Sequence, residues 1–219
     1  MSRGFGHAPL QAGPMQTYFD QRHGMNAIRV LPNEYVATGE DVVLTTVLGS
    51  CVSACLRDPV AGVGGINHFM LPVAGPDVGE LASRSLRYGI NAMDRLIEAL
   101  VAQGARPTRL EAKVFGGGQL MTGVAGARIG EANARFVVDY LQREGIVVHA
   151  RDLGENCARQ LHYFPATGRA RVKRLSDIDP KLAQHDRLLA DTLVELLPVG
   201  DIAGPVAVDI SRRWREQAS

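Results

Sequence analysis

The stretch from residue 34 to residue 71 constrains the fold most, because it contains several strand-like segments in succession. Short strands are expected at residues 35–38, 42–48, 52–57 and 63–71. Val52, Ala54 and Leu56 alternate with less apolar residues, which is the two-residue period of a half-buried strand. Asp58-Pro59 then predicts a turn into the returning strand. Strands joined by tight turns favour an antiparallel arrangement over an alternating parallel fold.

The remainder of the chain mixes helices with further strands. Helices are predicted at residues 80–103, about 130–144 and about 180–197, where apolar residues recur on one helical face. Further strands are expected at residues 110–114 and 146–150, and at 161–164 and 170–175 as a hairpin. Only two helices interrupt the strand series before the last helix. The sequence therefore predicts an α+β fold with a mixed sheet.

Composition limits the class of protein. The chain has 219 residues, 46% of them hydrophobic, and a formal net charge of +1. This size fits one domain with extensions, and the balanced charge argues against a nucleic-acid partner. No apolar run is long enough to insert into a membrane, and the N-terminus has no signal-peptide pattern. Three cysteines without metal-ligand spacing predict neither a disulfide scaffold nor a zinc site, so a cytoplasmic location is expected.

Composition also predicts three parts of the chain. Residues 1–30 are rich in Gly, Gln, Pro and His and lack periodicity, so a flexible N-terminal arm is expected there. Residues 31–175 are well patterned and form the predicted central domain. Residues 176–219 are expected to be a C-terminal helical extension, which either packs on the core or contributes to a docking surface.

Cys51 and His68 are the candidate catalytic pair. Cys51 follows Gly49 and Ser50 in a turn of small residues, and His68 lies seventeen positions later on the returning strand. A thiol with a pKa of about 8.5 needs a neighbouring base to act as a nucleophile at neutral pH. Backbone N–H groups at Gly49 and Ser50 would stabilise an oxyanion. Thr45, on the strand leading to Cys51, is expected to orient the histidine as the third group of a triad.

Alternative interpretations remain open for each of these residues. Free cysteines are most often small buried hydrophobes, and a histidine in an apolar strand is most often a hydrogen-bonded core residue. Cys55 could pair with Cys51 in a redox sensor, but four residues of extended strand would hold them about 13 Å apart. The five other histidines are scattered, and no two of them have metal-ligand spacing on a helix.

The motifs around this pair resemble the chemoreceptor glutamine deamidase family, CheD. The matching segments are Thr45–Val52, Leu56–Pro59 and Gly64–Pro72, followed by Lys113–Gly117, Ile129-Gly130 with Asn133, and Asp152–Gly154 to Val172-Lys173. The resemblance spans roughly residues 34–175. It implies a β-sandwich of mixed sheets flanked by helices, similar to the cysteine deamidases of the cytotoxic necrotizing factor type.

The resemblance also implies an activity and partners. The family hydrolyses glutamine side chains of methyl-accepting chemotaxis receptors to glutamate, through a Cys, His and Thr triad and without a cofactor. The triad falls on Cys51, His68 and Thr45, with the neighbouring Thr46 as the alternative to Thr45. The implied partners are the helical bundles of the receptors and the phosphatase CheC, and a methylesterase side activity is expected.

A rim for docking the receptor is expected around the thiol. Its predicted members are Phe115, Gly116 and Gly117, together with Asn156 and Arg159 from a segment in which Ala158 replaces a family glycine. The main rival interpretation is a docking module with weak catalysis, which would bind receptors without modifying them. A general cysteine protease is disfavoured because no pattern indicates a peptide cleft.

Overall fold

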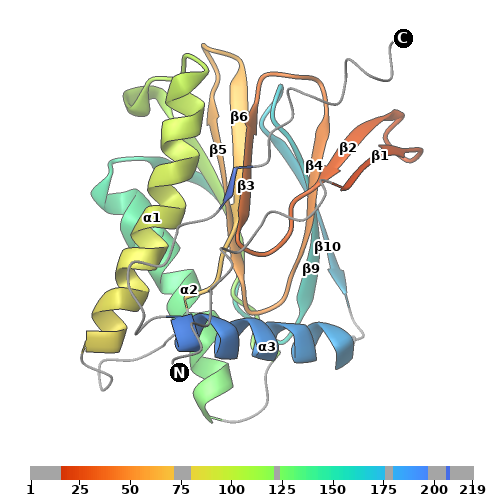
Figure 1. Cartoon of the computed structure of the whole chain (residues 1–219). Coiled ribbons are helices and arrows are strands. Elements are labelled where there is room, and N and C mark those ends of the chain that lie inside the picture. The colour runs from red at the N-terminus through yellow and green to blue at the C-terminus, as the bar shows by residue number, and fades with distance from the viewer. Residues whose placement is uncertain (1–15, 72–79, 121–123, 176–179, 197–205, 208–219) are drawn as a thin grey trace, which may run out of the picture.

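Two mixed β-sheets pack face to face in the computed structural model (Figure 1). The structure describes residues 16–71, 80–120, 124–175, 180–196 and 206–207. The five-stranded sheet has the order β1-β2-β4-β9-β10 and the six-stranded sheet the order β11-β3-β6-β5-β7-β8. Each sheet contains both parallel and antiparallel pairs. The predicted α+β class with a sandwich of mixed sheets is therefore confirmed.

The bounds of the elements are as follows. The five-stranded sheet contains β1 (Gln16–Asp20), β2 (Met25–Arg29), β4 (Val43–Leu48), β9 (Ala158–Phe164) and β10 (Arg169–Leu175). The six-stranded sheet contains β3 (Glu34–Thr38), β5 (Val52–Asp58), β6 (Val63–His68), β7 (Glu111–Gly116), β8 (Val147–Leu153) and β11 (Val206–Ala207). The helices are α1 (Glu80–Ala102), a 3-10 turn (Pro107–Arg109), α2 (Val124–Arg143) and α3 (Pro180–Leu196).

The core lies between the sheets and beneath the first two helices. One cluster of buried side chains joins Leu44 and Leu48 of β4 to Leu56 of β5 and Ile66 of β6. Helices α1 and α2 cover the other face of the six-stranded sheet, whereas α3 runs across one end of the sandwich (Figure 1). No helix within the described residues is long and apolar enough to span a membrane.

The N-terminal region departs from the prediction. Residues 16–29, expected in an irregular arm, form the β1–β2 hairpin, and β2 pairs in parallel with β4. The sequence pattern for these strands is weak because the hairpin buries few apolar side chains. Ala27 and Ile28 are buried, but Tyr18 and Phe19 are exposed. Residues 1–15 of the expected arm lie outside the described residues. The proposed division at residues 30 and 175 stays a prediction.

Helix α2 begins earlier than the expected start near residue 130. Two glycines in Val-Ala-Gly-Ala-Arg-Ile-Gly weaken the helical pattern, because glycine has a low helix propensity. Gly130 has a packing role, since a Cβ at this position would collide with the backbone of Gly117 and Gly118. The glycine therefore lets α2 approach the loop that follows β7.

Candidate active site

The turn between β4 and β5 holds Cys51 in a fixed backbone conformation. Gly118 N–H donates to the carbonyl of Gly49 at 2.8 Å, and Gly117 N–H donates to the carbonyl of Cys51 at 2.7 Å. The amide of Asn133, on α2, donates to the carbonyl of Ser50 at 2.8 Å. Because all three carbonyls of the turn are engaged on the side of α2 and the β7 loop, the turn has little freedom to move.

His68 lies across the strand pair from Cys51. Val52 and Phe69 form an antiparallel bridge with two hydrogen bonds of 2.9 Å and 3.1 Å. Their neighbours Cys51 and His68 are then diagonal partners on one face of this pair, a separation that side chains can span. The Asn133 side chain also accepts the N–H of Leu71 at 2.7 Å, which ties the chain after His68 to the Cys51 turn.

Thr46 fixes the orientation of the His68 ring. The Thr46 hydroxyl donates its proton to the carbonyl of Val30 at 2.8 Å, and its oxygen lies 2.8 Å from His68 Nδ1. A hydroxyl has one proton, so the oxygen must accept a hydrogen bond from Nδ1–H. This assigns the proton of the neutral ring to Nδ1 and leaves Nε2 with a lone pair. Among the described residues, the buried Nε2 has no hydrogen-bond partner.

The contact expected of Thr45 is therefore made by its neighbour Thr46. Successive strand residues face opposite sides of a sheet, and only the even-numbered positions of β4 face the inside of the sandwich. Thr45 lies on the outer side, where its hydroxyl is 3.2 Å from the Tyr18 hydroxyl and 3.4 Å from the carbonyl of Ile28. Its contacts attach the β1–β2 hairpin and do not include His68.

A carboxylate from α3 completes the surroundings of Cys51. Asp186 Oδ2 accepts the N–H of Ser50 at 2.6 Å and the Ser50 hydroxyl at 2.7 Å. Its other oxygen, Oδ1, lies 4.0 Å from Cys51 Sγ. The Ser50 N–H group, expected to face an oxyanion, is thus occupied by a carboxylate oxygen.

Burial dominates the electrostatics of the pair. Cys51 is fully buried and His68 is 2% exposed. Burial, followed by the negative charge of Asp186, raises the pKa of the Cys51 thiol well above its usual value. Burial lowers the pKa of His68 to about 3, assisted by the charge of His185. In this conformation the thiol and the imidazole are therefore both neutral at pH 7.

The predicted rim residues have other positions. Phe115 is buried, and Gly116 packs so closely on the carbonyl of Cys51 that a Cβ there would collide with it. Together with Gly117, this segment supports the turn from behind. Arg159 is completely buried and pairs with Asp152 at 2.9 Å, so its predicted place on a docking rim is wrong. Asn156 is exposed, and its role on a rim stays a prediction.

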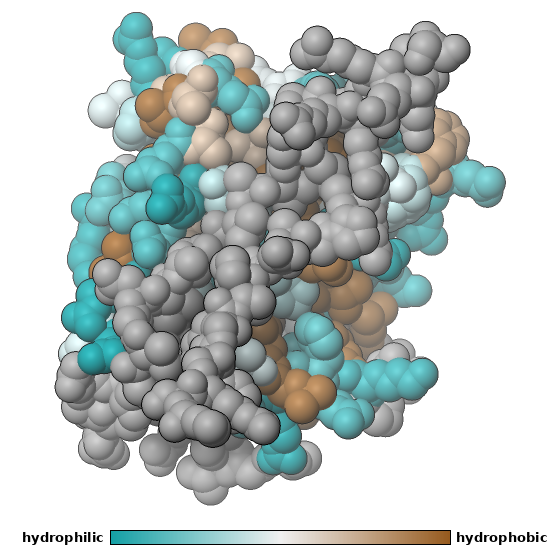
Figure 2. Space-filling view, viewed as in Figure 1, coloured by the Kyte–Doolittle hydropathy of each residue, from teal (hydrophilic) through white to brown (hydrophobic). Residues whose placement is uncertain are grey.

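An open pocket lies beside His68 instead. It has a volume of about 330 Å³, and its lining comes from β1, the β2–β3 connection, β4, His68, β9 and α3. The α3 side contributes Leu182, His185 and Asp186. On the face of the molecule in Figure 2, hydrophobic residues gather near α3, whereas most of the residues visible on α1 are hydrophilic. A ligand in this pocket would reach the imidazole from the α3 side.

The sequence analysis did not predict a role for Asp186, although the position of this residue on α3 is unusual. Leu182, Leu189 and Leu193 mark the apolar face of α3, and Asp186 follows Leu182 by four residues on that same face. A carboxylate on an apolar helical face indicates a specific partner, because its burial without hydrogen bonds is costly. Cys55 is also buried, and all three cysteines are free thiols.

The pH dependence of stability follows from His68. The pKa of this ring falls from 6.5 in the unfolded chain to about 3 in the folded protein. The unfolded state therefore binds more protons at intermediate pH, and stability is lost as the pH falls below about 6.5. We expect a loss of roughly 2 kcal/mol between about pH 8 and about pH 5.

Urea denaturation at the two pH values would measure this loss. The comparison is with His68→Gln, which cannot titrate and should show a correspondingly weaker dependence. Other groups titrate equally in both proteins, so an identical pH dependence in the variant would contradict a neutral buried His68.

The fold places a buried thiol and a buried imidazole on one face of a strand pair, and comparisons with known proteins identify the family. The model of the family described as CheD chemotactic sensory transduction matches residues 70–174. Relatives from Bordetella petrii and Cupriavidus metallidurans, both named "Probable chemoreceptor glutamine deamidase CheD", are each 50% identical to this chain. The alignments cover 84% and 88% of this chain, and 83% and 89% of the relatives.

The chain therefore belongs to the CheD family, as its motifs predicted. Among solved structures, protein NMB0706 of Neisseria meningitidis is similar with a TM-score of 0.36 and 12% identity. That match covers 62% of this chain and 65% of the other, and it is too distant to bear on function.

Proposed function

We propose that this protein hydrolyses glutamine side-chain amides of chemoreceptors to glutamate, with Cys51 as nucleophile and His68 as general base. The observation that carries the proposal is the state of the His68 ring. Its Nδ1–H is held by Thr46, and its buried Nε2 has no partner among the described residues. An imidazole held in this way keeps its lone pair on Nε2, which is the atom that a general base uses to take a proton from a thiol. The names of the two relatives supply the substrate class.

The first half of the reaction forms a thioester. His68 Nε2 takes the Cys51 proton, and the thiolate sulfur attacks the carboxamide carbon. The negative charge that develops on the amide oxygen is stabilised by the Ser50 N–H, a contribution of about 2.7–4 kcal/mol for one such donor. His68 then returns the proton to the leaving nitrogen, so the C–N bond breaks and ammonia departs.

The second half hydrolyses the thioester. A water molecule gives a proton to His68 Nε2 and attacks the same carbon, and the C–S bond breaks as the thiolate regains its proton. The products are a glutamate side chain, ammonia and free enzyme, with no redox change. A glutamate methyl ester presents a similar carbonyl, so we also propose a methylesterase side activity with methanol as the leaving group.

A receptor assay tests the activity itself. Incubating the full chain with a cytoplasmic fragment of a methyl-accepting chemoreceptor should release ammonia and convert specific glutamines to glutamate, detected by peptide mass spectrometry. A fragment with those glutamines replaced by glutamate is the control. Stable binding to several receptor fragments without any conversion would instead favour the docking-module interpretation. Competition by CheC, the proposed second partner, would appear as slower conversion in the same assay.

Replacing Thr46 by alanine should lower the deamidation rate by roughly 10- to 100-fold, the typical cost of removing a group that orients a functional imidazole. The matched control is Thr45→Ala, which lies one residue away on the opposite face and should change the rate less than about threefold. Thr46→Ser, which keeps the hydroxyl, should restore most of the activity. The rate is measured by ammonia release from the receptor fragment. A larger loss in Thr45→Ala than in Thr46→Ala would reverse the assignment of the third group.

A further inference from the structure

The reactive turn is covered by a side chain of the same molecule. Asp186 projects from α3 onto the Cys51 turn, where Oδ2 binds the N–H and the hydroxyl of Ser50 and Oδ1 faces the thiol at 4.0 Å. A Cβ on Gly49 would collide with this carboxylate, so the group lies directly on the glycine backbone. Asp186 is only 2% exposed. An external side chain cannot occupy this position while α3 is in place.

The carboxylate resembles the product of the proposed reaction. A carboxylate and a carboxamide are both planar groups with two polar atoms on one carbon. Oδ2 takes the Ser50 N–H that the amide oxygen would need, and the other oxygen faces the sulfur. The group is also presented by a helix, with Leu182 and Leu189 on the same face. An amphipathic helix laid into a groove with an anchor side chain is a recurring mode of recognition.

We propose that α3 is an internal occupant of the substrate site, and that Asp186 stands where the substrate glutamine must bind. This inference rests on the proposed function and extends it. The substrate glutamine is presented by a helix that takes the place of α3. The protein with α3 over Cys51 is then a resting form, because the substrate helix must compete with α3 for the same position. Release of α3 also removes the carboxylate beside Cys51, one of the two causes that hold the thiol protonated.

The accessibility of the Cys51 thiol to a reagent tests whether α3 covers the site, independently of deamidation. In the full chain, Asp186→Ala should increase the rate of Cys51 alkylation by iodoacetamide roughly tenfold, because the competent open state becomes more populated. The matched control is Asp191→Ala, an exposed carboxylate on the same helix, which should alkylate like wild type. Peptide mass spectrometry separates Cys51 from Cys157. An unchanged rate at Cys51 would overturn the inference.

Deamidation of the receptor fragment separates an inhibitory carboxylate from a catalytic one. Asp186→Ala should raise kcat/KM severalfold, roughly in proportion to the gain in open state. A lower kcat with unchanged alkylation would mean that Asp186 assists the chemistry, and it would overturn the inference while leaving the proposed function intact. If wild type does not deamidate any receptor fragment, the proposed function fails, whereas the alkylation result still decides whether α3 covers the site.

Placing an amide on α3 gives the sharpest test. In Asp186→Asn and Asp186→Gln, the helix presents a carboxamide to Cys51, and attack by the thiol followed by water would convert it to a carboxylate with release of ammonia. The mass of the peptide should shift accordingly in at least one variant. The shift should be absent when Cys51→Ala is added. Intact amides in both variants, in an enzyme that deamidates the receptor fragment, would show that α3 does not occupy the substrate position.

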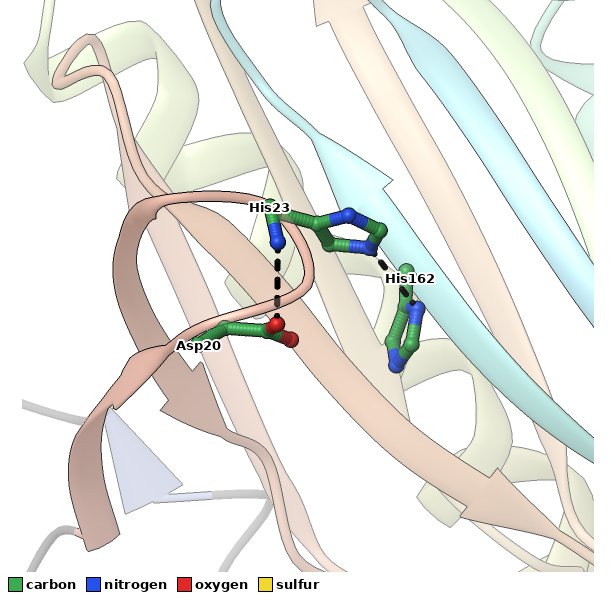
Figure 3. A group of neighbouring side chains, drawn as sticks. All are labelled: Asp20, His23 and His162. Atoms are coloured by element: carbon green, nitrogen blue, oxygen red, sulfur yellow. Dashed lines mark hydrogen bonds between the residues drawn. The ribbon is translucent and has the colours of Figure 1, made fainter.

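A second site is carried by a different observation. The fold brings together His23 and His162, although they are 139 positions apart and the sequence predicted no metal-ligand pair. His23 Nε2 and His162 Nδ1 are 3.1 Å apart, and Asp20 lies on the same turn as His23 (Figure 3). One donor atom from each of the three residues lies within 4.8 Å of the others. These atoms come from the β1–β2 turn and from β9.

The geometry points to a site for a divalent transition metal such as Zn²⁺. Two ligands of a tetrahedral ion are about 3.3 Å apart when the bonds are about 2.0–2.1 Å, close to the observed separation of the nitrogens. Asp20 is preorganised, since one of its oxygens accepts the N–H groups of Arg22 and His23 at 2.9 Å and 3.1 Å. The His162 ring is buried beside the hairpin turn, so its position is fixed by the packing around it. A bound ion would attach the hairpin to β9.

Zn²⁺ titration of the full chain tests this site by binding and by thermal unfolding. A hundredfold excess over Kd should raise Tm by roughly 5–10 °C, because an ion that binds only the folded state stabilises it. His162→Gln and His23→Ala should each abolish the shift. His149→Ala, an exposed histidine on β8, is the control and should retain it. No binding in wild type, or unchanged binding in both variants, would overturn the assignment.

Discussion

Cys51→Ala is expected to abolish deamidation, with a loss of at least about 10⁴-fold, the scale seen when a catalytic nucleophile is removed. His68 and the Ser50 N–H remain in this variant, but water must then attack the amide without a covalent intermediate. The fold should persist, because the turn is held by backbone and Asn133 hydrogen bonds that do not involve the sulfur. Ammonia release from a receptor fragment measures the loss, and the far-UV circular dichroism spectrum checks the fold.

Cys55→Ala is the matched control for this experiment. Cys55 is also buried and lies on β5, four residues after Cys51, and burial raises its pKa as well. Its removal creates a similar small cavity but leaves the proposed nucleophile in place. Activity should therefore stay within about threefold of wild type, since the mechanism assigns Cys55 no role. Retained activity in Cys51→Ala, or equal losses in both variants, would contradict the thiol mechanism.

The strand and helix pattern was predictable where a segment has a strong period and clear stops. The helices at residues 80–103 and 180–197 match α1 and α3 closely, because their apolar faces are long and end at Gly104 and Pro198. The β1–β2 hairpin could not be predicted from such a pattern. Its strands are short and half-exposed, and they are held by pairing with β4 rather than by an apolar face of their own.

Only the part of the candidate site that lies in short sequence motifs was predictable. Cys51 and His68 follow from the turn and the returning strand, but two positions depend on long-range packing. The choice between Thr45 and Thr46 depends on which face of β4 looks into the sandwich, and both neighbouring residues are threonines. Asp186 approaches Cys51 from 135 positions away, which no local pattern encodes. Its presence on an apolar helical face indicated a buried partner without indicating which one.

The largest loss of stability is expected from Asp58→Ala, at the last residue of β5 beside the turn into β6. The Asp58 side chain is completely buried and pairs with Arg109 at 2.6 Å. It also accepts the N–H groups of Val60, Ala61 and Arg106 at 2.9–3.0 Å. Removing one partner of a buried, hydrogen-bonded ion pair costs about 3–5 kcal/mol. For a protein of this size, Tm should fall by roughly 10 °C, measured by calorimetry.

Asp58→Asn separates the charge from the hydrogen bonds of this turn. The amide oxygen can still accept the turn N–H groups, but the attraction to Arg109 is lost, so a smaller loss than in Asp58→Ala is expected. Arg109, followed by the N–H donors, holds the pKa of Asp58 well below its usual range. The contribution of the ion pair to the free energy of unfolding is thus fully present above about pH 4 and is lost as the pH falls further. The stability difference between wild type and Asp58→Asn should therefore narrow in acid. A difference that stays constant through this range would assign the effect to packing rather than to the ion pair.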